Sequence, residues 1–188
     1  NEPNYNLKIN NLSHGAMTGK MLIEIEKLIL KHKPNLILVY GDTNSTLAGA
    51  LAAAKLNIPL AHVEAGLRSF NKKMPEEINR ILTDQLSDIL FTPSSSAKNN
   101  LINEGIKKNK IKISGDVMLD VLKKYIYLIK NLNLNEKIDS INKEYILVTI
   151  HRQENTDNYS NLLNITSSLI EVSKKFKIIW PLHPRTKI

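Results

Sequence analysis

The segment HVEAGLRSFNKKMPEEINR, residues 62–80, gathers ionisable side chains around a turn. Glu64 ends an apolar run, Arg68 follows four residues later, and Glu76 comes directly after Pro75. Carboxylates whose ionisation is set by burial and by neighbouring charges can move protons, and a nearby cation can hold an anionic ligand. A solvated surface could carry the same residues by chance. The alternative is a site that moves a proton beside an anionic ligand.

Ionisable residues also follow three other apolar runs of the chain. Asp42 comes after LILVY, His151 and Arg152 come after YILVTI, and His183 follows KIIWPL. Apolar runs without polar alternation are typical of strands that are buried on both faces of a parallel sheet. Ligands of such sheets bind beyond the carboxyl ends of the strands, so the ionisable residues within each unit should lie along one edge.

The candidate residues fall into two chemical groups, and none of them is expected to bind a metal. Three carboxylates and two histidines suit acid–base chemistry: Asp42, Glu64, Glu76, His151 and His183. Three arginines suit the binding of phosphate or carboxylate: Arg68, Arg152 and Arg185.

Each carboxylate also has a structural interpretation. Asp42 could cap the helix that follows it. Glu64 could form an ion pair with Arg68, and Glu76 could interact favourably with a helix N-terminus. The remaining polar residues of the segment are interpreted as structural, through packing or hydrogen bonding or by continuing the helix: His62, Glu77, Asn79 and Arg80.

The elements that must position these residues alternate between strand and helix. Strands are predicted at residues 36–40, 58–64, 88–94, 111–115, 145–150 and 177–182, and helices at 18–31, 45–56, 75–86, 96–104, 116–132 and 159–176. This alternation predicts right-handed βαβ units, parallel sheets and the α/β fold class. Residues 1–115 are expected to form most of one Rossmann-like domain, 116–143 a connecting helix and linker, and 144–188 the start of a second domain.

Composition narrows the class of protein. The 188 residues, 42% of them hydrophobic, suffice for one substantial core or for one domain and part of another. The absence of cysteine excludes disulfides and thiolate metal sites. The net charge of +8 is interpreted as a lysine-rich solvated face, because only 5% of the residues are aromatic and could stack on single-stranded nucleic acid. The sequence shows no long apolar span or cleavable signal, which predicts a cytoplasmic protein.

The stretch GDTNSTLAGALAAAKLNIPLAHVEAGLRSFNKKMPEEINRILTDQLSD, together with IHRQEN and PLH, closely resembles the non-hydrolysing UDP-N-acetylglucosamine 2-epimerase family. The resemblance runs from about Met17 to the end of the chain. It implies two Rossmann-like domains that face each other across a cleft, the GT-B arrangement, with the second domain incomplete in this chain. It also implies a UDP-sugar substrate, no cofactor, no nucleic-acid or membrane partner, and a homodimer in the full-length protein.

The resemblance assigns roles to individual residues. Asp42, Glu64 and Glu76 match the catalytic carboxylates of the family, and His151 matches a histidine near the nucleotide diphosphate. Arg152 and His183 match positions that some relatives use for the substrate or for a regulatory second sugar nucleotide. Arg68 is expected to balance the carboxylate charges and to contribute to substrate binding.

The implied reaction breaks the bond between C1 and UDP before C2 is inverted. A carbon next to an oxocarbenium-like C1 loses its proton readily, which gives 2-acetamidoglucal and UDP, and UDP then adds back after protonation of the opposite face. Carboxylates beside such a carbon are also used by glycosidases, and cations can hold the detached UDP. Which carboxylate accepts the proton and which donates it stays open.

Two family elements are expected outside this sequence: an opening strand with its glycine, arginine and lysine loop before Asn1, and a late glycine-serine loop and glutamate after Ile188. We therefore expect a fragment that is inactive alone.

The segments GDVMLD, HRQENTDN and HPRT favour relatives that act on modified sugars such as UDP-2,3-diacetamido-glucuronic acid, while Gln153 stands where many relatives have arginine. The alternatives are a hydrolysing epimerase, a GT-B glycosyltransferase, a non-catalytic sugar-nucleotide-binding protein and, last, a basic nucleic-acid-binding module.

Overall fold

The computed structural model describes residues 2–130, 144–184 and 186. The chain divides into two compact units, Asn1–Lys124 and Tyr125–Ile188. Each unit holds a parallel sheet, so the predicted α/β class is confirmed. Most of the predicted linker lies outside the described residues, and the three domain ranges expected from the sequence stay predictions.

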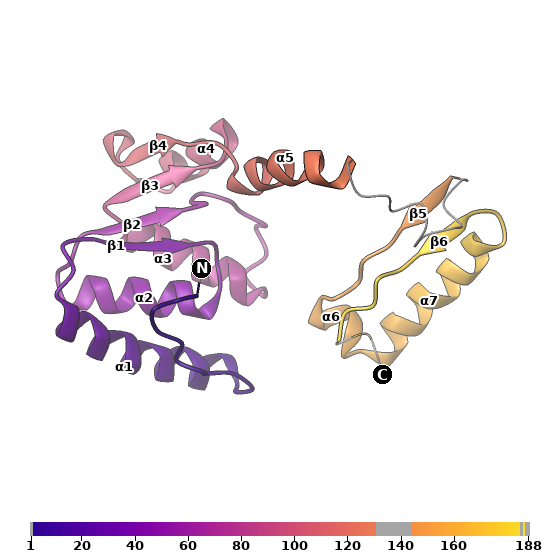
Figure 1. Ribbon diagram of the computed structural model, residues 1–188, viewed down its shortest axis with the longest axis horizontal. Helices are drawn as coiled ribbons and strands as arrows, with labels where there is room; N and C mark the ends of the chain where they lie inside the picture. Colours follow the sequence, from indigo (N-terminus) through magenta and orange to yellow (C-terminus); the bar gives the residue numbers. More distant parts are fainter. Residues whose placement is uncertain (1, 131–143, 185, 187–188) are drawn as a thin grey trace. The chain divides into compact units, whose positions relative to one another are not determined.

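The first unit is built on a sheet whose strand order equals the order along the chain (Figure 1). Its strands are β1 (Ile37–Tyr40), β2 (Leu60–Val63), β3 (Ile89–Thr92) and β4 (Ile111–Ile113). Each strand pairs in parallel with the next, with Tyr40 opposite Val63 and Val63 opposite Phe91. The carboxyl ends of β1 and β2 therefore lie side by side at one edge of the sheet.

Helices precede, connect and follow the strands of this sheet along the chain. They are α1 (His14–His32), α2 (Asn44–Lys55), α3 (Pro75–Leu86), α4 (Ser95–Asn103) and α5 (Val117–Lys130), with a short 3-10 helix at Lys108–Lys110. Helix α3 begins at Pro75, as its sequence predicts, because proline suits the first helical position. Helix α4 is capped by Ser94 and is followed by Gly105 with a positive φ of 86°.

The core of the first unit lies where α2 and α4 meet the sheet. One cluster joins β1, β2 and α2 and consists of Val39, Ala50, Ala53 and Leu60. A second cluster consists of Ala65, Leu90, Leu101 and Ile111. The alanine-rich sequence of α2 allows this helix to pack closely between α1 and β1. These contacts fix the strand ends that carry the candidate residues.

Strand β1 departs from the expectation that both of its faces are buried. Val39 packs against α2, whereas Leu38 and Tyr40 are 43% and 60% exposed. Helix α2 covers only one face of the strand, and alternate side chains of a strand point to opposite faces. The apolar run LILVY therefore predicted the strand correctly, but it predicted wrongly that both faces of the strand are buried within this unit.

The second unit contains β5 (Tyr145–Leu147), α6 (Gln153–Thr156), α7 (Tyr159–Ser173) and β6 (Lys177–Ile179). The two strands are parallel, with Tyr145 opposite Lys177. Both are shorter than predicted, because the paired register covers only three residues of each strand. Helix α6 was not predicted, since its four residues are too few to show a helical period. In the parts of the chain that the structure describes, no helix is long and apolar enough to cross a membrane.

Candidate active site

The first two candidate carboxylates come together because they follow adjacent parallel strands. Asp42 lies two residues beyond β1, and Glu64 lies directly beyond β2. The Gly41 N–H donates to the Val63 carbonyl at 3.1 Å, which continues the strand pairing up to these residues. A Cβ at Gly41 would lie 3.2 Å from Oε2 of Glu64, so the glutamate carboxylate sits against the backbone just before Asp42.

Glu64 adopts an unusual backbone conformation. Its φ is 74°, in the left-handed region, and the N–H groups of Glu64 and Ala65 both donate to the Phe91 carbonyl, at 3.1 and 3.0 Å. A non-glycine residue in this region costs about 1–2 kcal/mol. Such strain is typical of functional sites, where the surrounding structure holds the residue in place.

The electrostatic environment of Glu64 favours its protonated form. Burial raises the pKa of its carboxyl above the ordinary value, and the negative charges of Asp42 and Asp116 raise it further. Arg80 and His62 act in the opposite direction, but the net pKa is raised. Among the described residues, no ion pair involves Glu64. The structure therefore supports neither its predicted pairing with Arg68 nor any other neutralising contact.

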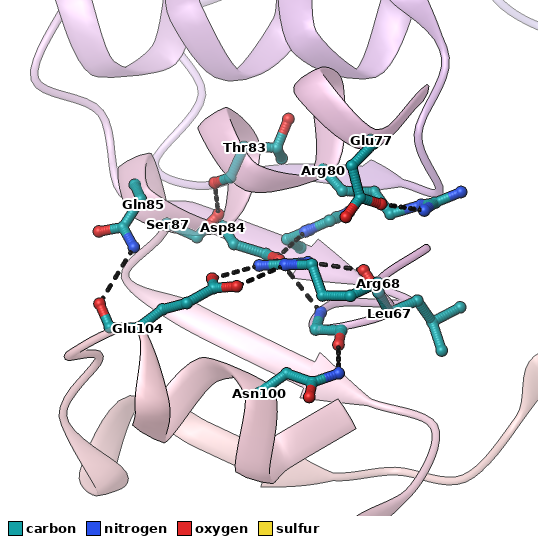
Figure 2. A network of polar contacts seen from close by, with 12 residues as sticks. Leu67, Arg68, Glu77, Arg80, Thr83, Asp84, Gln85, Ser87, Asn100 and Glu104 are labelled. Carbon is teal, nitrogen blue, oxygen red and sulfur yellow. Dashed lines mark hydrogen bonds and ion pairs between the residues drawn. The ribbon is translucent and has the colours of Figure 1, made fainter. Parts of the chain in front are cut away.

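Arg68 points to a different set of partners (Figure 2). Its Nη2 lies 2.8 Å from Oδ2 of Asp84 and 2.6 Å from Oε2 of Glu104, and its Nε donates to Oε1 of Glu104 at 2.7 Å. The Arg68 side chain is only 1% exposed. The guanidinium thus fixes the turn after Glu64 to helices α3 and α4, and its burial leaves no face for a ligand.

Arg80 supplies the cation that the sequence analysis assigned to Arg68. Its Nε donates to Oδ2 of Asp42 at 2.9 Å, and its Nη1 donates to Oε2 of Glu77 at 2.8 Å. Asn79 donates from Nδ2 to the Asp42 carbonyl at 2.8 Å. The predicted helix cap by Asp42 is not formed, because the N-cap of α2 is Thr43. Asp42 is instead held by α3.

Glu77 has a structural role, in agreement with the sequence analysis. It is buried and accepts hydrogen bonds from Ser69 N–H at 2.8 Å, Ser69 Oγ at 2.9 Å and Phe70 N–H at 3.0 Å. Burial alone would raise the pKa of Glu77, but the Ser69 and Phe70 hydrogen bonds and Arg80 lower it below its ordinary value. This carboxylate is an ionised anchor for the loop that precedes α3.

Glu76 is the third candidate carboxylate and lies in the first turn of α3. Residues three and four positions apart share one face of a helix, so Glu76 lies on the face that carries Asn79 and Arg80. That face contacts Asp42. Glu76 is half-buried, and no ion pair of the described residues includes it. It is thus available for a ligand at the Asp42 end of the helix.

His62 forms the hydrogen bonds that its alternation with Glu64 suggested. Its ring is fully buried, with Nδ1 2.7 Å from Oδ1 of Asp84 and Nε2 2.8 Å from the Gly41 carbonyl. No sequence pattern points to Asp84, which lies inside α3 and not at the carboxyl end of a strand. Asp84 also accepts from the Gly66 N–H at 3.1 Å.

The second unit brings two of its candidates together. The rings of His151 and His183, which follow β5 and β6, have centroids 5.6 Å apart. Thr186 ties the two strand ends together by donating from Oγ1 to the Ile150 carbonyl at 2.6 Å and from N–H to the His183 carbonyl at 2.8 Å. The Arg152 side chain is exposed, with Nη1 3.8 Å from Oε1 of Glu154. The predicted Arg185 lies outside the described residues.

The first unit thus combines a carboxyl group with a raised pKa, a carboxylate held by arginine and a third, accessible carboxylate. This combination can accept and donate protons within one site. The second unit offers two imidazoles and an exposed guanidinium, which can donate hydrogen bonds to phosphate oxygens. Within the described residues, no group of histidine, aspartate and glutamate side chains has the arrangement of a metal site.

Comparison with known proteins gives consistent matches. The family model described as UDP-N-acetylglucosamine 2-epimerase matches residues 1–188. A UDP-N-acetylglucosamine 2-epimerase homolog of Methanococcus maripaludis is 57% identical over 98% of this chain and 52% of its own length. The UDP-2,3-diacetamido-2,3-dideoxy-D-glucuronate 2-epimerase of Pseudomonas aeruginosa is 53% identical over 99% of this chain and 52% of its own length.

The solved structures agree. The UDP-GlcNAc 2-epimerase of Methanocaldococcus jannaschii, in complex with UDP-GlcNAc and UDP, has a TM-score of 0.93 and is 49% identical over the whole chain and 52% of its own length. The chain thus spans about half the length of the relatives it matches. The expected fold, parallel-sheet units of the two-domain GT-B type with only part of the second domain in this chain, agrees with these matches.

Proposed function

This chain belongs to the UDP-N-acetylglucosamine 2-epimerase family, and on that premise we propose that the protein containing it interconverts a UDP-N-acetylglucosamine-type sugar nucleotide with its C2 epimer. One structural observation supports the proposal most directly. Glu64, with its raised pKa, lies beside Asp42 at the carboxyl ends of adjacent parallel strands. Reversible proton transfer at carbon needs such a pair, because one group must hold a proton while a neighbour stays ionised.

The chemistry has two halves. In the first, the bond between C1 and the UDP oxygen breaks, UDP leaves with the electron pair, and the C2 proton moves to a carboxylate, which leaves 2-acetamidoglucal. In the second, a proton is delivered to the opposite face of C2 and the UDP oxygen re-forms its bond to C1. Negative charge close to C1 stabilises the oxocarbenium-like stage in both directions.

The carboxylates of the first unit take separate parts in this scheme. We assign the transfer of a proton at C2 to Glu64, because burial and Asp42 favour its protonated form. Asp42, held by Arg80 Nε at 2.9 Å, is assigned to stabilise positive charge on the sugar. Glu76, which shares a helix face with Arg80, is assigned to the opposite face of C2.

We assign the candidate residues of the second unit to the binding of UDP. His151 and His183, with ring centroids 5.6 Å apart, and the exposed Arg152 are suited to donate hydrogen bonds to diphosphate oxygens. These contacts would hold UDP while it is detached from the sugar. Arg68, predicted to bind substrate, is assigned to positioning the turn after Glu64 because its partners bury it.

The Pseudomonas relative supports a second candidate substrate. At 53% identity it is about as similar to this chain as the relatives named for UDP-N-acetylglucosamine, which are 50% and 51% identical. We therefore propose UDP-N-acetylglucosamine as the first substrate to test and a UDP-2,3-diacetamido-glucuronic acid as the second. A homodimer and a cytoplasmic location, both expected from the sequence, belong to the same proposal.

To test the proposal, the complete protein is incubated with UDP-N-acetylglucosamine in heavy water, and the sugar is followed by NMR. The proposal predicts deuterium at C2 together with a UDP sugar of mannosamine configuration. Free mannosamine derivative and UDP would identify a hydrolysing enzyme and reject the proposed re-addition step. If neither UDP-N-acetylglucosamine nor the diacetamido sugar exchanges its C2 proton, the proposed activity is rejected.

A further inference from the structure

We propose that His62 is a buried, doubly protonated positioning residue that holds the Asp42 and Glu64 turns in register. Both ring nitrogens face hydrogen-bond acceptors: Nδ1 lies 2.7 Å from Oδ1 of Asp84, and Nε2 lies 2.8 Å from the Gly41 carbonyl. A neutral imidazole carries one N–H and could donate to only one of them. Since a carbonyl oxygen cannot donate, the ring satisfies both contacts only as an imidazolium.

Asp84 has the environment of an ionised carboxylate. Its Oδ2 lies 2.8 Å from Nη2 of Arg68 and accepts from the Gly66 N–H at 3.1 Å. Hydrogen bonds from cations and backbone N–H groups favour the charged form of a carboxylate. Oδ1 of Asp84 is therefore an acceptor toward His62, and no proton from the aspartate is available to complete that contact.

The charges of the buried cluster balance only when His62 is protonated. Arg68 contacts two carboxylates, those of Asp84 and Glu104. With a neutral His62, the cluster would carry an uncompensated negative charge in a largely buried place, which is costly. An imidazolium supplies the missing positive charge. Figure 2 shows the Arg68 part of this cluster between α3 and α4.

The cluster reaches the proposed active site at two points. Through Nε2, His62 holds the Gly41 carbonyl, and Gly41 directly precedes Asp42. Through Asp84, it fixes the Gly66 N–H, two residues beyond Glu64. The same imidazole therefore links the turn after β1 to the turn after β2. This arrangement is suited to hold the relative position of the two carboxylates, which the proposed function needs.

His62 also acts on Glu64 through its charge. The charged groups around Glu64 are Asp42 and Asp116, which raise its pKa, and Arg80 and His62, which lower it. Loss of the imidazolium charge would therefore shift the titration of Glu64 to higher pH. The proposal rests on the proposed function for this catalytic consequence, whereas the protonation state of His62 can be measured without any substrate.

The first experiment is ¹⁵N NMR of the His62 ring in the complete protein, assigned by through-bond correlation to its backbone, at neutral pH. We expect both ring nitrogens to be protonated. A ring with one protonated and one unprotonated nitrogen overturns the proposal. This measurement needs no variant and no turnover, so it stands even if the proposed epimerase activity fails.

The second experiment compares Asp84→Asn with Asp88→Asn in the complete protein. Asp88 lies before β3, is exposed and pairs with Lys110. Its carboxylate also accepts a hydrogen bond from the Leu60 N–H at 3.1 Å, which the amide oxygen of asparagine can still accept. Asp88→Asn therefore makes the same chemical change without contact to the cluster. For Asp84→Asn we expect loss of the NMR signal of a doubly protonated His62 ring. We also expect kcat to fall by about 100-fold, because the catalytic groups are misplaced, with KM nearly unchanged. The pH profile of activity should shift to higher pH. Asp88→Asn should match the wild type.

Folded Asp84→Asn protein with wild-type kcat and pH profile would overturn the positioning role. If Asp84→Asn does not fold, His62→Asn replaces it, because the shorter side chain can reach at most one of the two acceptors. Wild-type protein that shows a doubly protonated His62 but no C2 exchange would reject the proposed function and leave the imidazolium in place.

Discussion

Arg80, on helix α3, donates from Nε to Oδ2 of Asp42 across 2.9 Å and thereby fixes a carboxylate that lies 38 residues earlier in the chain. The same guanidinium donates from Nη1 to Glu77 at 2.8 Å. The planar fork of arginine can serve two carboxylates in fixed directions, whereas the single ammonium of lysine cannot reproduce that geometry. The position of Asp42 therefore depends on the shape of this side chain as well as on its charge.

We expect Arg80→Lys to lower kcat of the complete protein by about 10- to 100-fold, the equivalent of one charged hydrogen bond of about 1.5–3 kcal/mol. The initial rate of C2 deuterium exchange measures this loss. Lys27→Arg, the reverse exchange at an exposed site of α1 where Lys27 pairs with Glu24, is the control and should leave proton exchange unchanged. Equal losses in both variants would contradict a special role for Arg80.

Gly41→Ala should impair both stability and turnover. Gly41 has a φ of 65°, which costs alanine about 1–2 kcal/mol, and the added Cβ would lie 3.2 Å from Oε2 of Glu64. Gly105→Ala is the matched control, because Gly105 has a φ of 86° and no atom within 4 Å of an added Cβ. Denaturant unfolding should show similar losses for both variants, while only Gly41→Ala should reduce kcat.

Glu64→Gln and Glu77→Gln should change stability in opposite directions at neutral pH. The pKa of Glu64 is raised in the folded protein, so the folded state holds this proton more tightly than the unfolded chain does. Its contribution to stability therefore falls as the pH rises above the ordinary value of 4.5 toward the raised one. At neutral pH, Glu64→Gln should be more stable than the wild type, although it removes proton exchange, and this gain should vanish in acid.

The ionisation of Glu77 should affect the stability of the folded protein in the opposite direction. Its pKa is lowered in the folded protein, so its ionised form adds stability above the ordinary value of 4.5, and this stability is lost as the pH falls through the folded pKa. Glu77→Gln should therefore be less stable than the wild type at neutral pH, with a difference that shrinks in acid. Urea unfolding of both variants at about pH 7 and pH 4 measures whether each substitution raises or lowers the stability.

His151→Asn should weaken UDP binding by about tenfold, as expected for loss of one strong hydrogen bond to phosphate. Titration calorimetry of UDP with the complete protein measures the change. His32→Asn is the control, because His32 is exposed in the first unit and contacts Tyr5. An unchanged dissociation constant for UDP in His151→Asn would remove this residue from the proposed diphosphate site.

The sequence predicted the elements well because each strand and helix carries its own local signal. Pro75 marks the start of α3, and Gly105 marks the end of α4. The burial of Leu38 and Tyr40 was predicted wrongly, since the apolar content of a strand does not tell how many helices cover it.

The closeness of Asp42 and Glu64 was predicted correctly, because the carboxyl ends of adjacent parallel strands share one edge of a sheet. Their catalytic roles stay predictions. The partners of Arg68 could not be found, because its choice among nearby carboxylates depends on side-chain directions in the folded state. Asp84 and Glu104 carry no local signal, and the pairing of Arg80 with Asp42 is visible only when α3 is docked on the sheet.

The strand order of the first sheet has a consequence for how the protein is made. Strands β1 to β4 pair in the order in which the ribosome releases them, and 22 residues separate His62 from Asp84 while 38 separate Asp42 from Arg80. Contacts between nearby parts of a chain close quickly, and the earlier parts of a chain can fold first during synthesis. The hydrogen bonds around Asp42, Glu64 and His62 can therefore form as soon as α4 has emerged, while the second unit is still being translated.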